Sequence, residues 1–336
     1  MRIAFDAMTS ELGVEEAVHG LFGALELVPD LTVLAVGAPA SLEPLLAAGP
    51  ARLRPRAQLV PALEVIGMDE EPGTAFKSKK DASVSVAARL VKEGKADGVF
   101  SAGNTGASMT AATLLLGRVP GVRRPAIFTP LPTSTGYCGL VDSGAVVDCR
   151  PEDLVQFAVM GSLYMQLVMG VPEPRVGLLS IGEEDKKGNA QTQETLPLLR
   201  QAPVRCLGNV EGRDLFDGSC DLAVCDGFVG NVVLKTAEGV SKLILTQLRE
   251  QYASHGPLAK LGGLLSRPVF RGMYRRMSPD TAGGGPLLGV GGVFVITHGK
   301  ANRTMVTNGL KLAAECARQD VPGHLKAAFK GAEQTA

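Results

Sequence analysis

Short runs of consecutive apolar residues recur along the chain, separated by stretches in which apolar residues return every three or four positions. The short runs have the length of buried strands and lack polar alternation, which indicates a mostly parallel sheet with helices on both faces. We therefore predict an α/β protein with three layers in the order α/β/α. The predicted strands cover residues 2–7, 32–37, 97–103, 125–132, 138–144, 175–182, 221–227 and 292–299.

The periodic stretches predict helices over residues 81–94, 151–169 and 231–250. We expect Asp81 to cap the first of these helices and Pro151 to open the second. The third carries an apolar stripe formed by Val233, Ala237, Val240, Ile244 and Leu248. The chain shows no internal repeat or low-complexity linker, so residues 1–336 are expected to form a single domain.

Composition narrows the possible functions. The 34 Lys and Arg residues balance the 34 Asp and Glu residues and aromatic residues make up 4%, so we predict no nucleic-acid partner. The six cysteines form no C-x-x-C pair and the four histidines are scattered, so we expect neither a metal site nor structural disulfides. No signal peptide and no run of about 18 uncharged apolar residues stands out, and the prediction is a cytoplasmic protein.

Polar residues and glycines follow several of the predicted strands. Ligands bind at the carboxyl ends of the strands in a parallel sheet, so these residues are expected to converge on one edge. Each corner alone is more often ordinary turn chemistry, but together they predict a site for a small anion. The residues concerned are Gly103, Asn104, Thr105, Gly106, Lys187, Asn189, Gly227, Gly230, Asn231 and His298.

The segment CDGFVGNVVLKT, residues 225–236, illustrates the two interpretations. Gly227 and Gly230 lack the Cβ that would keep a ligand away from the backbone, and a helix starting near Asn231 would aim free amides at an anion. The alternative is a plain turn between a strand and a helix.

Common catalytic motifs are missing. The residues around Lys187 lack the order and spacing of a Walker loop, no G-x-G-x-x-G follows the first strand, and no G-x-S-x-G occurs. What remains is a set of amide donors and one lysine without an obvious nucleophile. Such a set favours a reaction in which the substrate supplies the nucleophile, for example inorganic phosphate attacking an acyl carbonyl.

Several long motifs resemble the PlsX family of bacterial phosphate acyltransferases. They are SAGNTGA, VDCRPEDLVQFAVMGS, RVGLLSIGEEDKKGN, GNVEGRD and CDGFVGNVVLKTAEGV, and they occur in order over nearly the whole chain. The resemblance implies a Rossmann-like homodimer that transfers a fatty acyl group from acyl-carrier protein to inorganic phosphate, without a cofactor. The acyl phosphate product would supply the membrane glycerol-3-phosphate acyltransferase. The resemblance also implies catalytic roles for Lys187, which would neutralise the phosphate or the oxyanion, and for Asn231, which would orient one of them.

The chain departs from the family's pattern at two strand ends. Residues 8–14 read MTSELGV where the family usually has Met-Gly-Gly-Asp-His-Ala-Pro, and Val146 replaces an asparagine. Either change would alter the phosphate pocket, the acyl preference or the activity. We expect activity to be retained because the lysine and asparagine motifs are intact.

A helical protrusion is predicted over residues 251–285. No acidic residue occurs from Gln251 to Pro279, and glycines and prolines indicate a broken pair of helices. This basic, amphipathic segment is expected to contact an anionic membrane or the acidic carrier protein, and a dimer-packing hairpin is the alternative. The predicted contact residues are Lys260, Leu261, Leu265, Arg267, Arg271 and Arg275.

Two further functions remain open at this point. One is a phosphotransacetylase-like enzyme that uses acyl-CoA. The other is a catalytically weak scaffold that holds acyl-carrier protein at the membrane.

Overall fold

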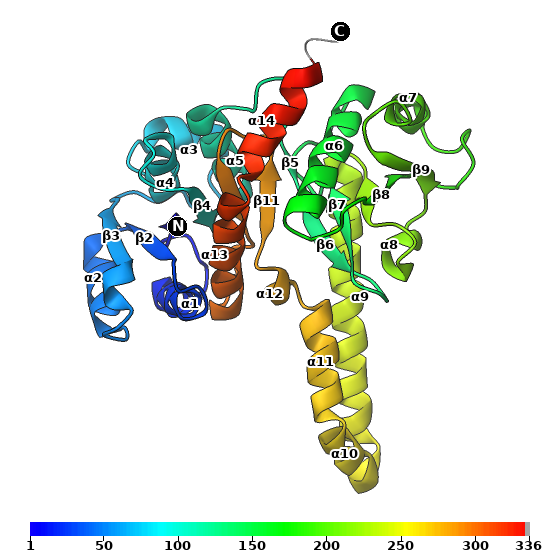
Figure 1. The fold of residues 1–336 in the computed structure, drawn as a ribbon. Coiled ribbons are helices and arrows are strands. Elements are labelled where there is room, and N and C mark those ends of the chain that lie inside the picture. Colours follow the sequence, from blue (N-terminus) through cyan, green and yellow to red (C-terminus); the bar gives the residue numbers. More distant parts are fainter. Residues whose placement is uncertain (333–336) are drawn as a thin grey trace.

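The computed structural model of the chain describes residues 1–332, without the side chains of residues 275–277, 279, 331 and 332. Two sheets form the body of the molecule, and a helical hairpin projects from it (Figure 1). The three-layer α/β prediction is confirmed, but the strands are divided between two sheets. Each sheet has helices on both faces.

The first sheet has the order β3-β2-β1-β4-β12-β11-β5. The first five of these strands run parallel, and β11 is antiparallel to both of its neighbours. In that order the strands cover Ala57–Pro61, Thr32–Gly37, Arg2–Asp6, Gly98–Ser101, Val293–Ile296, Gly285–Leu288 and Ala126–Ile127.

The second sheet has the order β6-β7-β10-β8-β9, in which only β6 is antiparallel to its neighbour. Its strands cover Thr129–Pro132, Tyr137–Val141, Leu222–Val224, Arg175–Leu179 and Arg205–Val210.

The predicted strand 125–132 is therefore two strands that belong to different sheets. Ile127 pairs with β11 in the first sheet, and Thr129 pairs with β7 in the second. Phe128 lies between them and is fully buried. Pro130 and Pro132 lack the amide that a central strand needs, and β6 is accordingly an edge strand.

Alternate residues of the strands face different helical layers. In β1, Ile3 and Phe5 pack with α1 (Val14–Leu27) and α13 (Arg303–Arg318), whereas Ala4 faces α4 (Ser83–Lys92). Around this sheet lie α2 (Pro39–Ala48), α3 (Pro72–Ser78), α5 (Thr105–Ala111), the 3₁₀ turn Arg54–Arg56 and the π-helical turn Ala112–Leu116.

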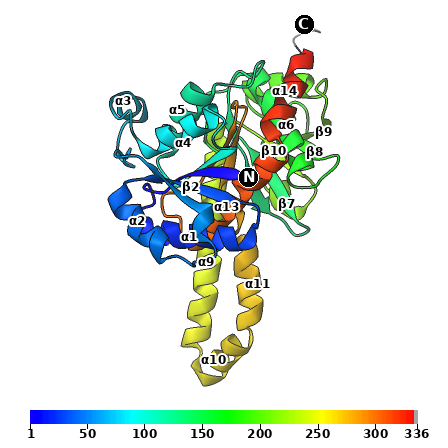
Figure 2. The same cartoon turned by 60° about the vertical axis from the view of Figure 1, so that its left-hand side comes forward.

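The second sheet lies between α6 (Pro151–Leu167) and α7 (Ala190–Leu199) on one side and α8 (Asp214–Asp217) and α9 (Gly227–Ser254) on the other. Helix α14 (Val321–Ala332) packs against α6, and Figure 2 shows it beside α6 and β10. The predicted opening of α6 at Pro151 is confirmed.

Two helix predictions need correction. Helix α4 begins at Ser83 with Ala82 as its cap, because the Asp81 carboxylate instead accepts a hydrogen bond from the amide of Leu63 at 2.8 Å. Helix α9 begins at Gly227, four residues before the predicted start, because Asp226 caps it through the amide of Val229.

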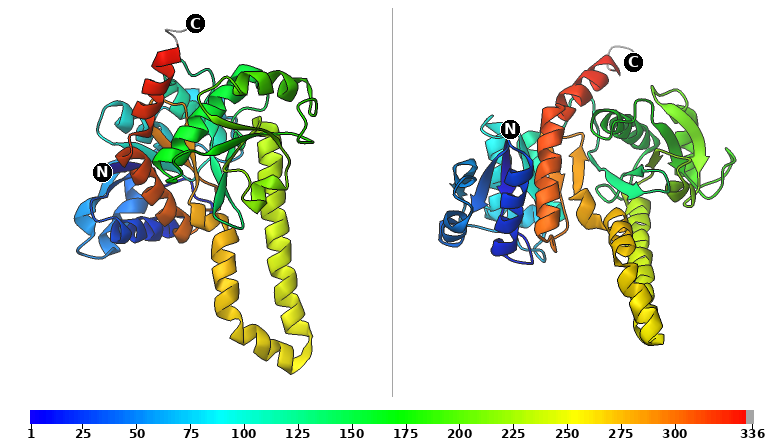
Figure 3. Two further views of the ribbon diagram at one scale, coloured as in Figure 1. Left: turned by 45° about the vertical axis from the view of Figure 1, so that its right-hand side comes forward. Right: turned by 60° about the horizontal axis from the view of Figure 1, so that its bottom comes forward.

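The hairpin consists of the distal part of α9, α10 (Gly256–Leu265) and α11 (Arg267–Met277), and α12 (Pro279–Ala282) returns the chain to the body (Figure 3). The broken pair of helices predicted here is confirmed. Of the predicted stripe on α9, Val233 packs against the core of the second sheet, whereas Val240 and Ile244 are 50% and 42% exposed, so the distal part of the stripe is not a core contact. Within the described part of the chain, no helix is both long and apolar enough to span a bilayer.

Candidate active site

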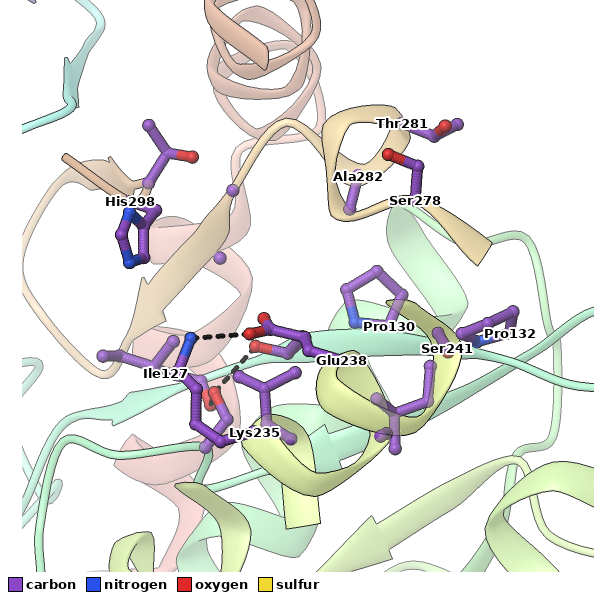
Figure 4. Close-up of a pocket in the computed structure, with 18 of the residues that line it drawn as sticks. Ile127, Pro130, Pro132, Lys235, Glu238, Ser241, Ser278, Thr281, Ala282 and His298 are labelled. Atoms are coloured by element: carbon purple, nitrogen blue, oxygen red, sulfur yellow. Dashed lines mark hydrogen bonds and ion pairs between the residues drawn. The ribbon is translucent and has the colours of Figure 1, made fainter. Parts of the chain in front are cut away.

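A cavity of about 630 Å³ lies between the two sheets (Figure 4). The carboxyl ends of β4 and β12 contribute Thr105, Thr297 and His298 from the first sheet. The end of β7 and the first turns of α9 contribute Ser143 and Asn231 from the second. The strand ends that meet at this cavity thus belong to two sheets, and the predicted strand end that carries Lys187 and Asn189 is not among them.

Helix α9 provides the charged groups of this cavity. Asn231, Lys235 and Glu238 are spaced four and three residues apart, which places them on one face of the helix. The Nζ of Lys235 lies 2.8 Å from an Oε of Glu238, and the two side chains are 49% and 32% exposed. Of the described residues that line the cavity, Lys235 alone is a lysine or arginine. A positive charge therefore stands one helical turn from the Asn231 carboxamide.

Hydroxyl groups also line the cavity, on Thr129, Ser143 and Thr297. The Oγ1 of Thr129 and the Oγ of Ser143 lie 2.7 Å apart, and Ser143 also donates to the carbonyl of Ile127 at 3.1 Å. Thr297 is 6% exposed, and its Oγ1 has no hydrogen-bond partner among the described residues. A buried hydroxyl without a partner is costly, so Thr297 offers a donor that an oxygen-rich ligand would satisfy.

The loop after β7 is held by the carboxylate of Asp142. It accepts hydrogen bonds from the amides of Ile127, Gly144, Ala145 and Val146 at 2.6–3.1 Å. Burial raises the pKa of this carboxyl above its ordinary value, while the amides act in the opposite direction. The loop that carries Ser143 is consequently fixed before any ligand binds.

Gly227 and Gly230 bring α9 against this loop. A Cβ on Gly227 would lie 2.6 Å from Oδ2 of Asp142, and one on Gly230 would lie 1.8 Å from its carbonyl oxygen. The amide of Gly227 donates to the carbonyl of Val146 at 2.8 Å. In this structure both glycines serve the close approach of helix and loop, and that contact positions Asn231.

The segment after β4 also has its polar groups engaged. Asn104 caps α5 through the amide of Ala107, and its Nδ2 donates to the carbonyls of Gly67, Met68 and Glu70. A Cβ on Gly103 would meet the side chain of Thr9, and one on Gly106 would meet Pro72. Of the four residues predicted in this segment, Thr105 lines the cavity.

Lys187 and Asn189 lie in the loop between β8 and α7, one strand further from the centre of the cavity. Lys187 is exposed and its side chain lies over Gly182. Asn189 caps α7 by accepting from the amide of Thr192 at 2.9 Å. Neither residue lines the cavity, so the structure does not bring the predicted pair of Lys187 and Asn231 together within one chain.

The altered loop after β1 is anchored away from the cavity lining. The hydroxyl of Thr9 donates to the buried Asp6 at 3.1 Å, and that of Ser10 donates to the carbonyl of Ala301 at 3.2 Å. Val146 packs partly buried against the core. None of Thr9, Ser10 and Val146 lines the cavity between the sheets.

Sequence reasoning missed Lys235, Glu238, Thr129 and Ser143. The first two carried a usable signal, since their spacing from Asn231 predicts a common helical face. The other two depend on how the two sheets meet. Thr297 lies at the end of the predicted strand 292–299, one of the strand ends expected to converge. Within residues 1–332, no group of three His, Cys, Asp or Glu residues is placed to hold a metal ion.

Solved structures share this architecture. The phosphotransacetylase of Streptococcus pyogenes is similar with a TM-score of 0.63 and 16% identity, covering 95% of this chain and 94% of that one. A phosphotransacetylase of Staphylococcus aureus gives 0.61 and 16%, with 94% of each chain covered. The class that fold and cavity define is thus the α/β fold seen in phosphotransacetylases.

The family is narrower than the fold. Residues 1–324 match the model of the family described as Fatty acid synthesis protein, and the chain belongs to that family. It is 48% identical over 320 residues to the phosphate acyltransferase of Heliobacterium modesticaldum, covering 95% of both proteins. The phosphate acyltransferase of Acidobacterium capsulatum is 46% identical over 327 residues, covering 97% of this chain and 96% of the relative. The resemblance found in the sequence is confirmed.

Proposed function

We propose that the chain transfers a fatty acyl group from the thioester of acyl-carrier protein to inorganic phosphate. The similarity to phosphate acyltransferases over nearly the whole chain supports acyl transfer to phosphate. The observation that carries the proposal is the cavity in which Asn231, Lys235 and Thr297 face a common space. It offers one cation and neutral donors, which is what a tetrahedral anion beside a thioester requires.

The reaction balances without a further reactant. An oxygen of hydrogen phosphate forms a bond to the acyl carbon, and the carbonyl oxygen becomes an oxyanion. The carbon–sulfur bond then breaks, giving acyl phosphate and a thiolate that takes the proton of the hydrogen phosphate. The protein has to align the two substrates and stabilise the oxyanion.

From the lining of the cavity we propose the following roles. The ammonium group of Lys235 binds the phosphate through its charge, and the phosphate replaces Glu238 as its partner. The hydroxyl of Thr297 donates a hydrogen bond to a phosphate oxygen. Asn231 orients the carbonyl and stabilises the oxyanion. Lys187 stays a catalytic candidate on the family resemblance alone, which implies that it neutralises the phosphate or the oxyanion, since it does not line this cavity. The predicted roles of His298 and Thr105 in substrate binding are retained because both line the cavity.

Acyl-carrier protein is the proposed donor because basic residues lie on the hairpin next to the cavity. Lys260, Arg267 and Arg271 are exposed there and match the acidic character of a carrier protein. Arg275 is also a predicted contact residue, but its side chain is not among those that the structure describes. A phosphotransacetylase-like enzyme that uses acyl-CoA is the alternative, and the similarity to phosphate acyltransferases supports it less well.

A homodimer and a peripheral membrane location complete the proposal. The hairpin exposes large apolar side chains, among them Leu258 at 82% and Leu265 at 73%, beside its basic residues. Such a surface fits an anionic membrane, where the acyl phosphate would pass to the glycerol-3-phosphate acyltransferase.

The test is acyl phosphate formation by the purified chain, measured with phosphate and either palmitoyl-carrier protein or palmitoyl-CoA. We expect phosphate-dependent turnover with the carrier-protein donor. Turnover with acyl-CoA but not with the carrier-protein donor would favour the phosphotransacetylase-like enzyme. If neither donor were turned over, the catalytically weak scaffold would be the remaining function.

A further inference from the structure

A second cavity, of about 1050 Å³, lies between the arms of the hairpin. We call it the hairpin groove, defined by its lining on α9, α10, α11 and the loop after β12. It shares several lining residues with the candidate active site, so the two cavities are continuous. The shared residues are Glu238, Ser241, Ser278, His298 and Met305.

Positively charged side chains line the hairpin groove from all of these elements. They are Lys242, Arg249, Lys260, Arg267, Arg271 and Lys300. Among the described residues, none of these six forms an ion pair or a side-chain hydrogen bond.

The carboxylates in the described lining of the groove are Glu238 and Asp280, and both have partners. Glu238 pairs with Lys235, and Asp280 accepts a hydrogen bond from Nδ2 of Asn302 at 2.9 Å. The groove therefore offers positive charge that its own carboxylates do not neutralise, and such a groove attracts an anion.

The cations of α9 follow a regular spacing. Lys235, Lys242 and Arg249 are seven residues apart, which places them along one face of the helix at intervals of about 10 Å. Lys235 lines the candidate active site, whereas Lys242 and Arg249 line the groove. Positive charge thus continues outwards from the reacting centre.

Two of the groove's cations lie at its near end, where it meets the candidate active site. Lys242 directly follows Ser241, and Lys300 lies two residues after His298. Both Ser241 and His298 line the two cavities, and the amide of Lys300 donates to Nδ1 of His298 at 3.1 Å.

The arginines of α11 belong to the far end of the groove. Arg267 and Arg271 lie within three residues of Phe270, whose ring meets that of Tyr252 edge to face with centroids 5.4 Å apart. Tyr252 is 21 residues beyond Asn231 on α9, which corresponds to about 31 Å at a rise of about 1.5 Å per residue.

We propose that the near end of the hairpin groove binds the phosphopantetheine arm of the acyl donor and that Lys242 and Lys300 hold its phosphate. The inference rests on the function proposed above, in which Asn231 faces the thioester, and it adds how the donor's arm is recognised. Carrier protein and coenzyme A both present their thioester on this arm, so the recognised chemistry is common to both donors.

The length of the arm selects the near end. About 13 bonds separate its sulfur from its phosphorus, and at an advance of about 1.25 Å per bond the extended arm spans about 16 Å. Lys242 is 11 residues beyond Asn231 on α9, which is also about 16 Å. Arg249 stands about 27 Å from Asn231 along the helix, beyond the reach of the phosphate.

The polarity of the near end also matches the arm. Between its sulfur and its phosphate the arm carries amide groups and a hydroxyl, which need hydrogen-bond partners once they leave water. The hydroxyls of Ser241 and Ser278 lie where the two cavities join, and Thr246 and Leu245 follow on α9. The phosphate itself gains charge-assisted hydrogen bonds from the two ammonium groups.

The first experiment measures the binding of 4′-phosphopantetheine and of pantetheine, which lacks only the phosphate, by titration calorimetry in a phosphate-free buffer. We expect 4′-phosphopantetheine to bind the unmodified chain about tenfold or more tightly, as hydrogen bonds to a charged group imply. The double variant Lys242→Ala/Lys300→Ala should bind the two compounds alike. Both lysines are exposed, so the fold should be unchanged.

Two matched variants locate the phosphate. Arg267→Ala removes a positive charge from the same groove at its far end and should keep the preference for 4′-phosphopantetheine. Lys235→Ala removes the cation assigned to inorganic phosphate and should keep the preference as well. A preference that is lost in Lys235→Ala but kept in the double variant would place the phosphate in the candidate active site and overturn the inference.

Kinetics identify which donor supplies the arm. The double variant should raise KM for the donor that the chain uses by about tenfold or more, with kcat nearly unchanged because the reacting groups are untouched. A rise for palmitoyl-carrier protein alone identifies carrier protein as the source, and a rise for palmitoyl-CoA alone identifies coenzyme A. An unchanged KM for both donors would overturn the inference.

The binding experiment needs no turnover, so the two proposals fail separately. If the chain forms no acyl phosphate from any donor, the proposed function fails, while the calorimetry still decides the inference. Equal binding of the two compounds by the unmodified chain would overturn it. A loss of preference in Arg267→Ala as large as that in the double variant would also overturn it, since the cause would then be the general field of the hairpin.

Discussion

The first turn of α9 lies so close to the loop after β7 that a Cβ on Gly230 would stand 1.8 Å from the carbonyl oxygen of Asp142. No rotamer change can relieve this clash, because both partners are backbone positions. The distance therefore couples the placement of Asn231, the next residue, to a loop that the Asp142 carboxylate already fixes.

Gly230→Ala should accordingly damage both stability and activity. We expect a loss of about 1–3 kcal/mol in the free energy of unfolding, as for an overpacked core, and a lower kcat as Asn231 moves. Gly239→Ala on the same helix is the control, since a Cβ at that position would meet open space. That control should gain about 0.5–1 kcal/mol. Urea unfolding measures both variants. If Gly230→Ala and Gly239→Ala changed the free energy of unfolding equally, the close contact at Gly230 would not be the cause.

The two candidate lysines are distinguished by a second prediction. Lys235→Ala should lower kcat/KM for phosphate by about 100-fold or more, because it removes the charge that faces the cavity. Folding should be unaffected, since the pair with Glu238 is half-exposed. Steady-state kinetics at varied phosphate concentration measures the effect, with Lys311→Ala on α13 as a surface control.

Lys187→Ala belongs in the same series. The family resemblance predicts a loss of activity, whereas Lys187 does not line the cavity of the single chain. If Lys187→Ala lost activity while Lys235→Ala kept normal phosphate kinetics, the role assigned to Lys235 would be refuted.

The sequence could predict the layers of the fold and the strand ends that carry chemistry, because both follow from local apolar patterns. It could not predict that Ile127 and Thr129 enter different sheets, since one continuous apolar run encodes both strands. The place of Thr129 in the site could not be predicted for the same reason. Such residues acquire their role from the meeting of two sheets, which no local pattern records.

Lys187 and Lys235 show the same limit at the level of chemistry. A glycine-rich charged loop draws attention to Lys187, while Lys235 stands inside an ordinary helix. The spacing of Lys235 from Asn231 predicts a common helical face, but only the three-dimensional arrangement shows that this face lines a cavity.

Acidification should weaken the second sheet through Asp221. Arg175 donates to both carboxylate oxygens at 2.8–2.9 Å, and these hydrogen bonds hold the pKa of Asp221 below its ordinary value of 3.8. A depressed pKa means that the pair stabilises the fold above the unfolded-state pKa and that this contribution is lost as the pH falls through the folded-state value. Asp221→Asn should cost about 1–2 kcal/mol at pH 7.

Urea unfolding at pH 7 and at about pH 3 checks this. The difference between Asp221→Asn and the unmodified chain should shrink at the lower pH. Asp185→Asn, which breaks an exposed pair with Arg200, is the control and should change stability little at either pH. A pH-independent difference for Asp221→Asn would argue against the ion pair as the cause.

The last prediction concerns the tip of the hairpin. Leu258 and Leu265 are 82% and 73% exposed and do not line the candidate active site, so they are free to insert into a bilayer without disturbing that site. Replacing both with serine should lower binding to phosphatidylglycerol vesicles by about tenfold or more, because each leucine contributes about 1.5–3 kcal/mol on burial. Turnover of a soluble donor should stay unchanged.

Vesicle flotation measures this binding, and Leu27→Ser on α1 is a matched control because Leu27 is also exposed, at 62%, but lies on the body. Raising the salt concentration should weaken the binding further, since Lys260, Arg267 and Arg271 supply an attraction of about 1 kcal/mol each to anionic lipid. If the serine variant floats like the unmodified chain, the exposed leucines do not mediate membrane contact, and a carrier-protein or dimer surface becomes the explanation for their exposure.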